Sequence, residues 1–344
     1  MGTQANKGWW EAEPLRIMEV SESFQDLSAR DPARDAQIRA DHHANIEHFH
    51  CMAINAGMDD MRFYFRTSVA GQSQVDRLGA YLPEAHRRGL KVIVYLNVHW
   101  YSMEFAAKHP DWVQIKEDGQ PLSGVYKTGT SFCVNSAYRE WVFQIVRDLC
   151  AYDIDGIFYD GPIFFANTCY CSACRDKYRA RYGTDLPRKS ERRGPEFARL
   201  LDFQADSLVD FLHDTREIIK AINPQIAFYM NGGGRTANWP TGRLNRKLVA
   251  EQDLLGSEGG FIYGDLRMTP LWKPGCEAKL MEAQAGGKPT VIFDCAGHKS
   301  WNFYTLPEAE IELLYADTIA NGGNVWFAVM PDDVGQPELR AIAR

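Results

Sequence analysis

The stretch AYREWVFQIVRDLCAYDIDGIFYDGPIFF, residues 137–165, contains one unit of the fold. Its first half, residues 137–152, has the apolar spacing of an amphipathic helix. Its second half begins at Asp155 and is rich in β-branched and aromatic residues, which predicts a buried strand. That strand ends at Asp160, where Gly161-Pro162 predicts a tight turn.

The same alternation continues almost from end to end of the chain. Strands are predicted near residues 17, 63, 94, 158, 228, 255, 292 and 326, with helical patterns in nearly every interval. Eight alternating units predict the α/β class and a single (β/α)8 TIM barrel over residues 1–344. An open doubly wound sheet is the alternative. It is disfavoured because no predicted strand is followed by a Gly-x-Gly-x-x-Gly turn.

The second unit of this barrel is the least regular one. We predict a helix through Ile38, His42, Ile46 and Phe49, followed by a strand over 61–65. That helix would also carry four histidines. On an outer barrel helix, such histidines are more often surface or satisfied core residues than metal ligands.

Composition excludes several classes of protein. The chain has 344 residues, of which 45% are hydrophobic, enough to bury a sizeable core. Its 38 Lys and Arg against 45 Asp and Glu give a net charge of −7, which provides no broad cationic surface for nucleic acid. No apolar run of 18 residues or secretory signal occurs, which predicts a cytoplasmic protein without a membrane partner. Oligomeric state stays open, a homo-oligomer included.

Polar and aromatic side chains follow the predicted strands, at the barrel end where reactive groups stand. Aromatic faces stack on the C–H faces of sugars, and hydroxyl groups need both donors and acceptors. This set therefore predicts a carbohydrate or glycoside substrate. The residues predicted to hold it are Glu19, Arg66, His99, Trp100, Tyr159, Asn231, Asp294, His298 and Trp301.

Cleavage of a glycosidic bond needs two carboxyl groups, an acid and a nucleophile or base. Asp160 is the first candidate because it ends the most apolar strand, although an acid after a strand can instead cap a turn. Glu258 is the second, in Ser-Glu-Gly-Gly after the sixth strand, where its alternative role is a surface loop acid. Asp294 competes with it for this role.

A cysteine cluster is the most specific local motif. Cys169, Cys171 and Cys174 form Cys-x-Cys-x-x-Cys, and Cys133 can reach them from the loop before the helix that leads to strand four. Four thiolates would close the coordination sphere of a structural zinc ion. A redox pair and small buried side chains are the alternatives.

Residues 158–183, together with SFCVNSAYREW at 131–141, resemble the barrel of family 42 β-galactosidases, in which a catalytic acid on strand four precedes a cysteine-rich zinc loop. Cys169 follows Asp160 by nine residues, a spacing similar to that of the family. The resemblance implies one structural zinc on the four cysteines. The chain departs from the family at the end of strand four, where Tyr159-Asp160 replaces Asn-Glu.

An aspartate at this position looks more like the α-L-fucosidases of families 29 and 151, where it is the nucleophile of a retaining mechanism. The chain also resembles the hypothetical glycosyl hydrolase barrels that combine this aspartate with the zinc loop. These resemblances imply a retaining, exo-acting hydrolase with Asp160 as nucleophile and Glu258 as acid/base. The alternatives are a β-galactosidase-like enzyme with Asp160 as acid and Asp294 as nucleophile, and a noncatalytic carbohydrate-binding barrel.

Overall fold

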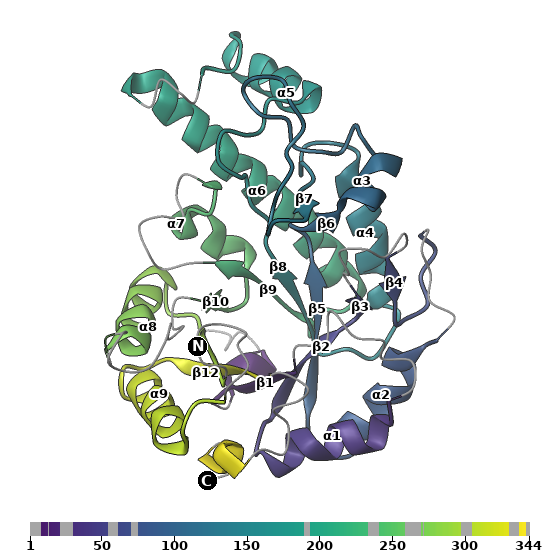
Figure 1. Ribbon diagram of the computed structural model, residues 1–344, viewed down its shortest axis with the longest axis vertical. Coiled ribbons are helices and arrows are strands. Elements are labelled where there is room, and N and C mark those ends of the chain that lie inside the picture. The colour runs from purple at the N-terminus through teal and green to yellow at the C-terminus, as the bar shows by residue number, and fades with distance from the viewer. Residues whose placement is uncertain are drawn as a thin grey trace, which may run out of the picture.

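The computed structural model describes residues 8–12, 14–20, 30–53, 61–69, 75–188, 193–232, 241–258, 270, 272–296, 305–329 and 337–341. Within these residues, eight parallel strands close into a barrel (Figure 1). The TIM-barrel prediction is confirmed. In their order around the barrel, the strands are β1 (Arg16–Val20), β2 (Ile46–His50), β5 (Lys91–Asn97), β8 (Gly156–Asp160), β9 (Ala227–Gly232), β10 (Leu255–Ser257), β11 (Thr290–Cys295) and β12 (Asn324–Val329).

Helices surround the strands, and α5 with the first part of α6 extends beyond the barrel (Figure 1). The α-helices are α1 (Pro32–Asp41), α2 (Arg77–His86), α3 (Met103–Lys108), α4 (Tyr138–Leu149), α5 (Ser172–Tyr182), α6 (Gly194–Ile222), α7 (Asn245–Leu248), α8 (Lys273–Gln284) and α9 (Glu308–Ala320). The 3-10 helices are η1 (Trp9–Glu11), η4 (Val249–Glu251) and η6 (Pro337–Ala341). Among the described residues, no helix has both the length and the apolar character needed to cross a membrane.

The prediction for the second unit was wrong. The barrel strand is β2, whereas the predicted strand at 61–65 contains only β4 (Arg62–Phe63), which pairs with β3 (Met52–Ala53) outside the barrel. His48 and His50 therefore lie on a strand, not on an outer helix. The pattern misled because β2 carries polar residues on both faces: Glu47 pairs with Arg39 of α1, and His48 packs inside the barrel.

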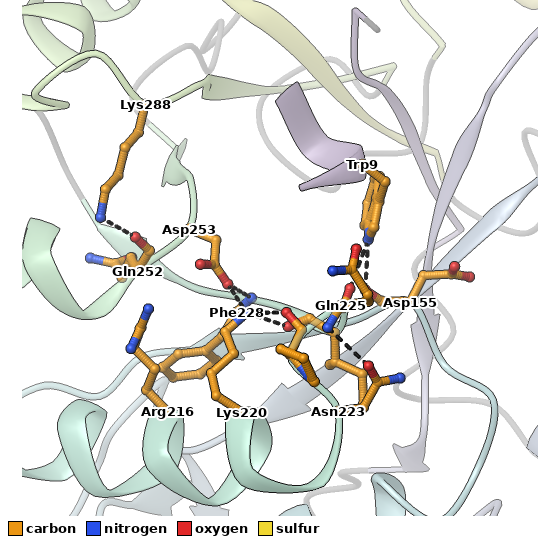
Figure 2. Close-up of polar contacts among 12 residues, drawn as sticks. Trp9, Asp155, Arg216, Lys220, Asn223, Gln225, Phe228, Gln252, Asp253 and Lys288 are labelled. Atoms are coloured by element: carbon orange, nitrogen blue, oxygen red, sulfur yellow. Dashed lines mark hydrogen bonds and ion pairs between the residues drawn. The ribbon is translucent and has the colours of Figure 1, made fainter. Parts of the chain in front are cut away.

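Apolar side chains fill the barrel and close its N-terminal end. Ile17, Phe158 and Trp326 belong to an internal cluster that also includes Trp10 of η1. The neighbouring Trp9 donates its indole N–H to the backbone carbonyl oxygens of Asp155 and Gln225, at 3.2 and 3.1 Å (Figure 2). The double tryptophan thus covers the end of the barrel at which the strands begin.

A two-stranded antiparallel sheet lies between β5 and α4 in the chain, next to the C-terminal end of β5. Its strands are β6 (Tyr101–Ser102) and β7 (Gly129–Thr130), and α3 begins directly after β6. Ser102 caps α3 by accepting a hydrogen bond from the backbone N–H of Phe105 at 3.1 Å. This pairing brings the segment that precedes β7 next to the end of β5.

Candidate active site

Asp160 occupies the last position of β8 and binds the two neighbouring strands. Its Oδ1 accepts a hydrogen bond from Asn231 Nδ2 on β9 at 3.0 Å, and its Oδ2 accepts one from the hydroxyl of Tyr95 on β5. Both carboxylate oxygens are therefore satisfied by uncharged donors. Such donors fix the direction in which a carboxyl group points.

Glu258 directly follows β10 and is the second carboxyl group of the site. Desolvation by the surrounding protein raises its pKa to about 8, and the negative charge of Asp160 raises it further. Arg243 and a hydrogen bond with Asn231 act in the opposite direction. The side chain keeps access to solvent, so the protein surrounds this carboxyl group without covering it. Glu258 is thus predominantly protonated at neutral pH.

Asn231 links the two carboxyl groups because its side chain bonds to both Asp160 and Glu258. The structure therefore brings together the two acids that the sequence singled out. Asp160 receives hydrogen bonds from neutral donors on both neighbouring strands, whereas the pKa of Glu258 is raised to about 8. Two neighbouring carboxyl groups in different surroundings, one of them with a raised pKa, are typical of acid–base catalysis.

Sequence reasoning missed three residues of the site: Tyr95, Arg243 and Tyr126, which contacts His99. Tyr95 lies two positions before Asn97, the last residue of β5. Because side chains alternate along a strand, Tyr95 and Asn97 share one face of β5, which could have pointed to Tyr95. Arg243 lies outside any strand, and the sequence carried no signal for it. Desolvation lowers the pKa of its guanidinium group, whereas the charges of Glu258 and Asp160 oppose this shift.

Glu19 lies at the C-terminal end of β1 and is fully enclosed by hydrogen-bond donors. His48 Nδ1 lies 3.1 Å from its Oε2, His50 Nε2 lies 3.3 Å from its Oε1, and Trp326 Nε1 donates to Oε2 at 2.9 Å. Burial alone would raise the pKa of Glu19, but the two histidines lower it to about 2. The ring of His50 stacks on the ring of Tyr95 with centroids 4.2 Å apart. The buried cluster around Glu19 therefore packs against the tyrosine that donates to Asp160.

His99 and Trp100 follow β5 and lie beside the carboxyl pair. His99 Nδ1 is 2.7 Å from the backbone oxygen of Asp160, and its Nε2 is 3.2 Å from the hydroxyl of Tyr126. Trp100 is largely buried, and its indole N–H donates to the backbone oxygen of Val125 at 3.1 Å. His99 therefore contacts the site directly, whereas Trp100 supports the segment that carries Tyr126.

Three residues predicted to hold the substrate point away from this cluster. Tyr159 faces α6, where its hydroxyl lies 3.1 Å from Thr215 Oγ1. Asp294 faces α9, where Thr318 donates to its Oδ2 at 3.3 Å. Arg66 is exposed and pairs with Asp76 at 3.1 Å. The reason for the first two is strand alternation: Phe158 and Phe293 face the barrel interior, so their successors face the helices.

Two further predicted residues, His298 and Trp301, lie outside the described residues. The candidate set for which the structure gives a place beside the carboxyl pair is therefore Glu19, His99, Asn231, Tyr95, Arg243 and Tyr126.

The four cysteines of the predicted metal site form one buried cluster. The Sγ atoms of Cys133, Cys169, Cys171 and Cys174 all lie within 4.8 Å of one another. Tetrahedral coordination with Zn–S bonds of about 2.3 Å places the sulfur atoms about 3.8 Å apart, so the cluster has the size that one such ion requires. Asn135 Nδ2 donates to Cys174 Sγ at 3.3 Å. These residues could hold a metal ion.

The cysteine cluster is connected to the segment that follows Asp160. Cys169–Cys174 lie in that segment, and Cys133 comes from the loop before α4. The buried side chain of Gln114 reinforces the connection: its Nε2 donates to the Ile163 oxygen at 2.7 Å, and its Oε1 accepts from Thr168 Oγ1 at 2.5 Å. The cluster thus helps to fix the chain beyond the candidate nucleophile.

Comparison with known proteins finds similarity to glycoside hydrolases. Residues 40–161 match the model of a family described as hypothetical glycosyl hydrolase 6. That match confirms the resemblance to glycoside hydrolase barrels. It covers β2, β5 and β8 up to Asp160. No curated protein matches the chain.

Solved structures share the barrel at low sequence identity. α-L-Fucosidase isoenzyme 2 from Paenibacillus thiaminolyticus is 22% identical, with a TM-score of 0.70 over 96% of this chain and 48% of that chain. The PgaB (BpsB) glycoside hydrolase domain from Bordetella bronchiseptica is 15% identical, with a TM-score of 0.77 over 96% of this chain and 98% of that chain. A β-galactosidase from Rahnella sp. R3 is 16% identical, with a TM-score of 0.73 over 96% of this chain and 55% of that chain. The chain thus spans about half the length of the fucosidase and the β-galactosidase. The family match and these neighbours together support a glycoside hydrolase.

Proposed function

We propose that this protein is a retaining, exo-acting glycoside hydrolase with an α-L-fucosidase-like mechanism. The observation that carries the proposal is the contrast between its two linked carboxyl groups. Asp160 is oriented by hydrogen bonds from Tyr95 and Asn231, and Glu258 has its pKa raised to about 8. An anionic nucleophile and a protonated acid are the two groups that such a reaction needs. The name of the fucosidase with the same fold supports the specific version.

The reaction runs in two steps in this proposal. Asp160 attacks the anomeric carbon while the bond to the leaving oxygen breaks, and that oxygen takes the proton of Glu258. The product is a glycosyl ester on Asp160 and an ionised Glu258. In the second step, Glu258 removes a proton from water, the resulting oxygen attacks the anomeric carbon, and the ester bond to Asp160 breaks. Both carboxyl groups then return to their starting states.

Tyr95 and Asn231 have defined parts in this mechanism. Both bond Asp160 in the ground state, so they orient its carboxylate and stabilise the ion. As the ester forms, the carboxylate loses its charge, and Glu258 becomes the negative group beside Arg243 and Asn231. His99 is proposed to bind a hydroxyl group of the sugar. Glu19, which is enclosed by its own partners, is proposed to support Tyr95 through His50, and Trp100 supports the segment that carries Tyr126. His298 and Trp301 remain predictions for binding the sugar.

The β-galactosidase-like alternative loses its proposed nucleophile. Asp294 is 1% exposed and contacts Thr318 of α9, on the side of β11 that faces away from the barrel interior. A carboxylate in that position would have to cross the sheet to reach a sugar bound at Asp160. Glu258 is therefore the partner that we propose for Asp160.

A panel of 4-nitrophenyl glycosides, led by α-L-fucoside and β-D-galactoside, tests the function. Wild type and Asp160→Asn are assayed in parallel, and the anomer released first is followed by NMR. Cleavage by wild type alone, with the configuration retained, supports the proposal. An inverted product would contradict the mechanism, and equal cleavage by both proteins would remove Asp160 from the reaction. Sugar binding without turnover on any substrate would favour the noncatalytic alternative.

We further propose that the cysteine cluster binds one structural zinc ion. Four buried sulfur donors within 4.8 Å of one another suit a tetrahedral ion and leave no open position for substrate. The ion would supply the positive charge that allows four clustered thiols to ionise. Its role would be to hold the chain after β8, and the chemistry at Asp160 would not involve it.

Metal content and thermal unfolding test the zinc proposal together. We expect about one zinc per chain by elemental analysis and a lower unfolding temperature for Cys133→Ser, because loss of one ligand opens the site. Cys150→Ser is the matched control, since Cys150 is buried outside the cluster. Absence of bound metal in the purified protein, or rapid loss of activity on chelation without unfolding, would contradict a structural zinc.

A further inference from the structure

Tyr126 lies in a tight turn just before β7, and its backbone adopts an uncommon conformation. Its φ is 47° and that of Lys127 is 74°, values in the left-handed region that residues other than glycine rarely adopt. Such conformations persist only where the surrounding structure determines them, and they cluster at functional sites.

The turn is held in place by contacts on both sides of Tyr126. Val125 and Gly129 exchange two backbone hydrogen bonds of 2.9 Å, and Trp100 Nε1 donates to the Val125 oxygen at 3.1 Å. A Cβ atom at Gly129 would lie 2.2 Å from Trp100 Nε1, so glycine is required there. The indole of Trp100 therefore fixes where Tyr126 stands.

The ring of Tyr126 is open to solvent although its hydroxyl is anchored at the site. Tyr126 is 67% exposed, the highest value among the large apolar side chains that the structure describes. Its hydroxyl lies 3.2 Å from Nε2 of His99, whose Nδ1 contacts the Asp160 backbone. The rings of His99 and Trp100 meet it at 85° and 78°, so neither lies flat on it. A face of the tyrosine remains available to a ligand.

The carboxyl pair lies within electrostatic range of this hydroxyl. Desolvation raises the pKa of Tyr126, and the negative charges of Asp160 and Glu258 raise it further. The phenol is therefore neutral at any working pH, and its ring belongs to the same site as the two acids.

We propose that Tyr126 is the platform on which the leaving group of the substrate stacks. This inference rests on the proposed function and adds a substrate class to it: glycosides whose leaving group is itself a ring, such as a second pyranose or an aryl group. The sugar that is attacked must lie over Asp160. The leaving group lies toward solvent in an exo-acting enzyme, and among the described residues Tyr126 is an exposed aromatic ring attached to the site.

Paired substrates separate this role from a general effect on catalysis. For the sugar that the wild type cleaves, kcat/KM is measured for the 4-nitrophenyl and the methyl glycoside. The ratio of variant to wild type is taken within each substrate, so the intrinsic reactivity of the leaving group cancels. Tyr126→Ala should lose about tenfold on the aryl glycoside and less than about twofold on the methyl glycoside. Tyr126→Phe keeps the ring and should retain most of the discrimination.

Two further variants guard the interpretation. Tyr126→Gly removes the ring and suits the left-handed backbone, so it reports on stacking even if alanine disturbs the turn. Trp272→Ala is the matched control, because Trp272 is 61% exposed at the start of α8 and its loss should leave both ratios unchanged.

The outcomes distinguish the inference from the function on which it rests. Equal losses on both substrates would overturn the platform and assign Tyr126 a positioning role through His99. No loss on either substrate would overturn it as well. If the wild type cleaves no glycoside, the proposed function is wrong, and the platform, which rests on that function, is wrong with it.

Discussion

Strand β8 has an aspartate at each end, and the two have opposite surroundings. Asp155, just before the strand, binds Lys91 Nζ at 2.6 Å and His86 Nε2 at 2.9 Å, and it accepts the Val92 N–H at 2.9 Å. Asp160, at its end, receives its side-chain hydrogen bonds from the uncharged groups of Tyr95 and Asn231. The first carboxylate is thus bound directly by the ammonium group of Lys91, whereas the second has neutral hydrogen-bond donors and interacts electrostatically with Arg243. The same residue type supports stability at one end of a barrel and chemistry at the other.

Charged side chains at the end of the barrel where the strands begin have close partners at other strands as well. Lys220 Nζ binds Asp253 Oδ2 at 2.6 Å and the Ile226 oxygen at 2.7 Å, and Lys288 binds the Gln252 oxygen at 2.5 Å (Figure 2). These charges are matched by partners of the same chain. At the C-terminal end, by contrast, Glu258 has a pKa of about 8 because its surroundings do not stabilise its anion fully.

The largest effect is expected from Asp160→Asn. The amide keeps the size and the contact with Tyr95 but cannot form the glycosyl ester, so kcat should fall about 10⁴-fold while the free energy of unfolding changes little. Single-turnover hydrolysis and urea unfolding measure the two quantities. A fall in both by comparable free energies would erase the difference between the two ends of β8.

The next effect is a pH dependence carried by Glu258. Since its pKa is about 8 and the proposed acid must be protonated, kcat/KM should decline about tenfold per pH unit above pH 8. In Glu258→Gln this alkaline decline should vanish. The variant should still cleave 2,4-dinitrophenyl glycosides, whose leaving group needs no proton. An unchanged alkaline decline in Glu258→Gln would show that another group is the acid.

Asp155→Asn is the counterpart at the other end of β8. It removes the negative partner of Lys91 and His86, and the free energy of unfolding should fall by about 2 kcal/mol with kcat/KM within twofold of wild type. Urea unfolding at pH 7 and the glycoside assay check both statements. A loss of activity without a loss of stability would contradict the division of roles between the two ends.

The sequence predicted most of the barrel because its strands are apolar and its helices amphipathic. It failed at β2, where Glu47, His48 and His50 are buried by specific partners and leave no apolar alternation to recognise. Tertiary contacts that satisfy polar groups are invisible to a pattern of hydrophobicity.

For the site, the sequence could find residues only by their place along a strand. Position after a strand identified Asp160 and Glu258, which the structure links through Asn231. Position along a strand did not show which way a side chain points: Asp294 also lies near the end of a strand, but its side chain faces the helices. It gave no signal for Arg243 or Tyr126, whose loops owe their course to long-range contacts such as that of Trp100 with Val125.

Asp294 sharpens the comparison in a third direction, because it stands near the C-terminal end of its strand but points outward. Burial raises its pKa from 3.8 to about 8, while Thr318 and Lys273 oppose the shift. The folded protein therefore holds a proton that the unfolded chain has lost over this range, so the free energy of unfolding falls as pH rises from about 4 through 8.

Asp294→Asn removes this titration and keeps a partner for Thr318. Between pH 6 and pH 9, the variant should lose about 3 kcal/mol less stability than wild type, with activity within twofold. Urea unfolding at several pH values measures the difference, and Glu258→Gln serves as the parallel variant on the inner side. If Asp294→Asn instead abolished glycoside cleavage while leaving stability unchanged, an outward carboxyl group would have a part in the chemistry, and strand direction would not be what separates the two kinds of acid.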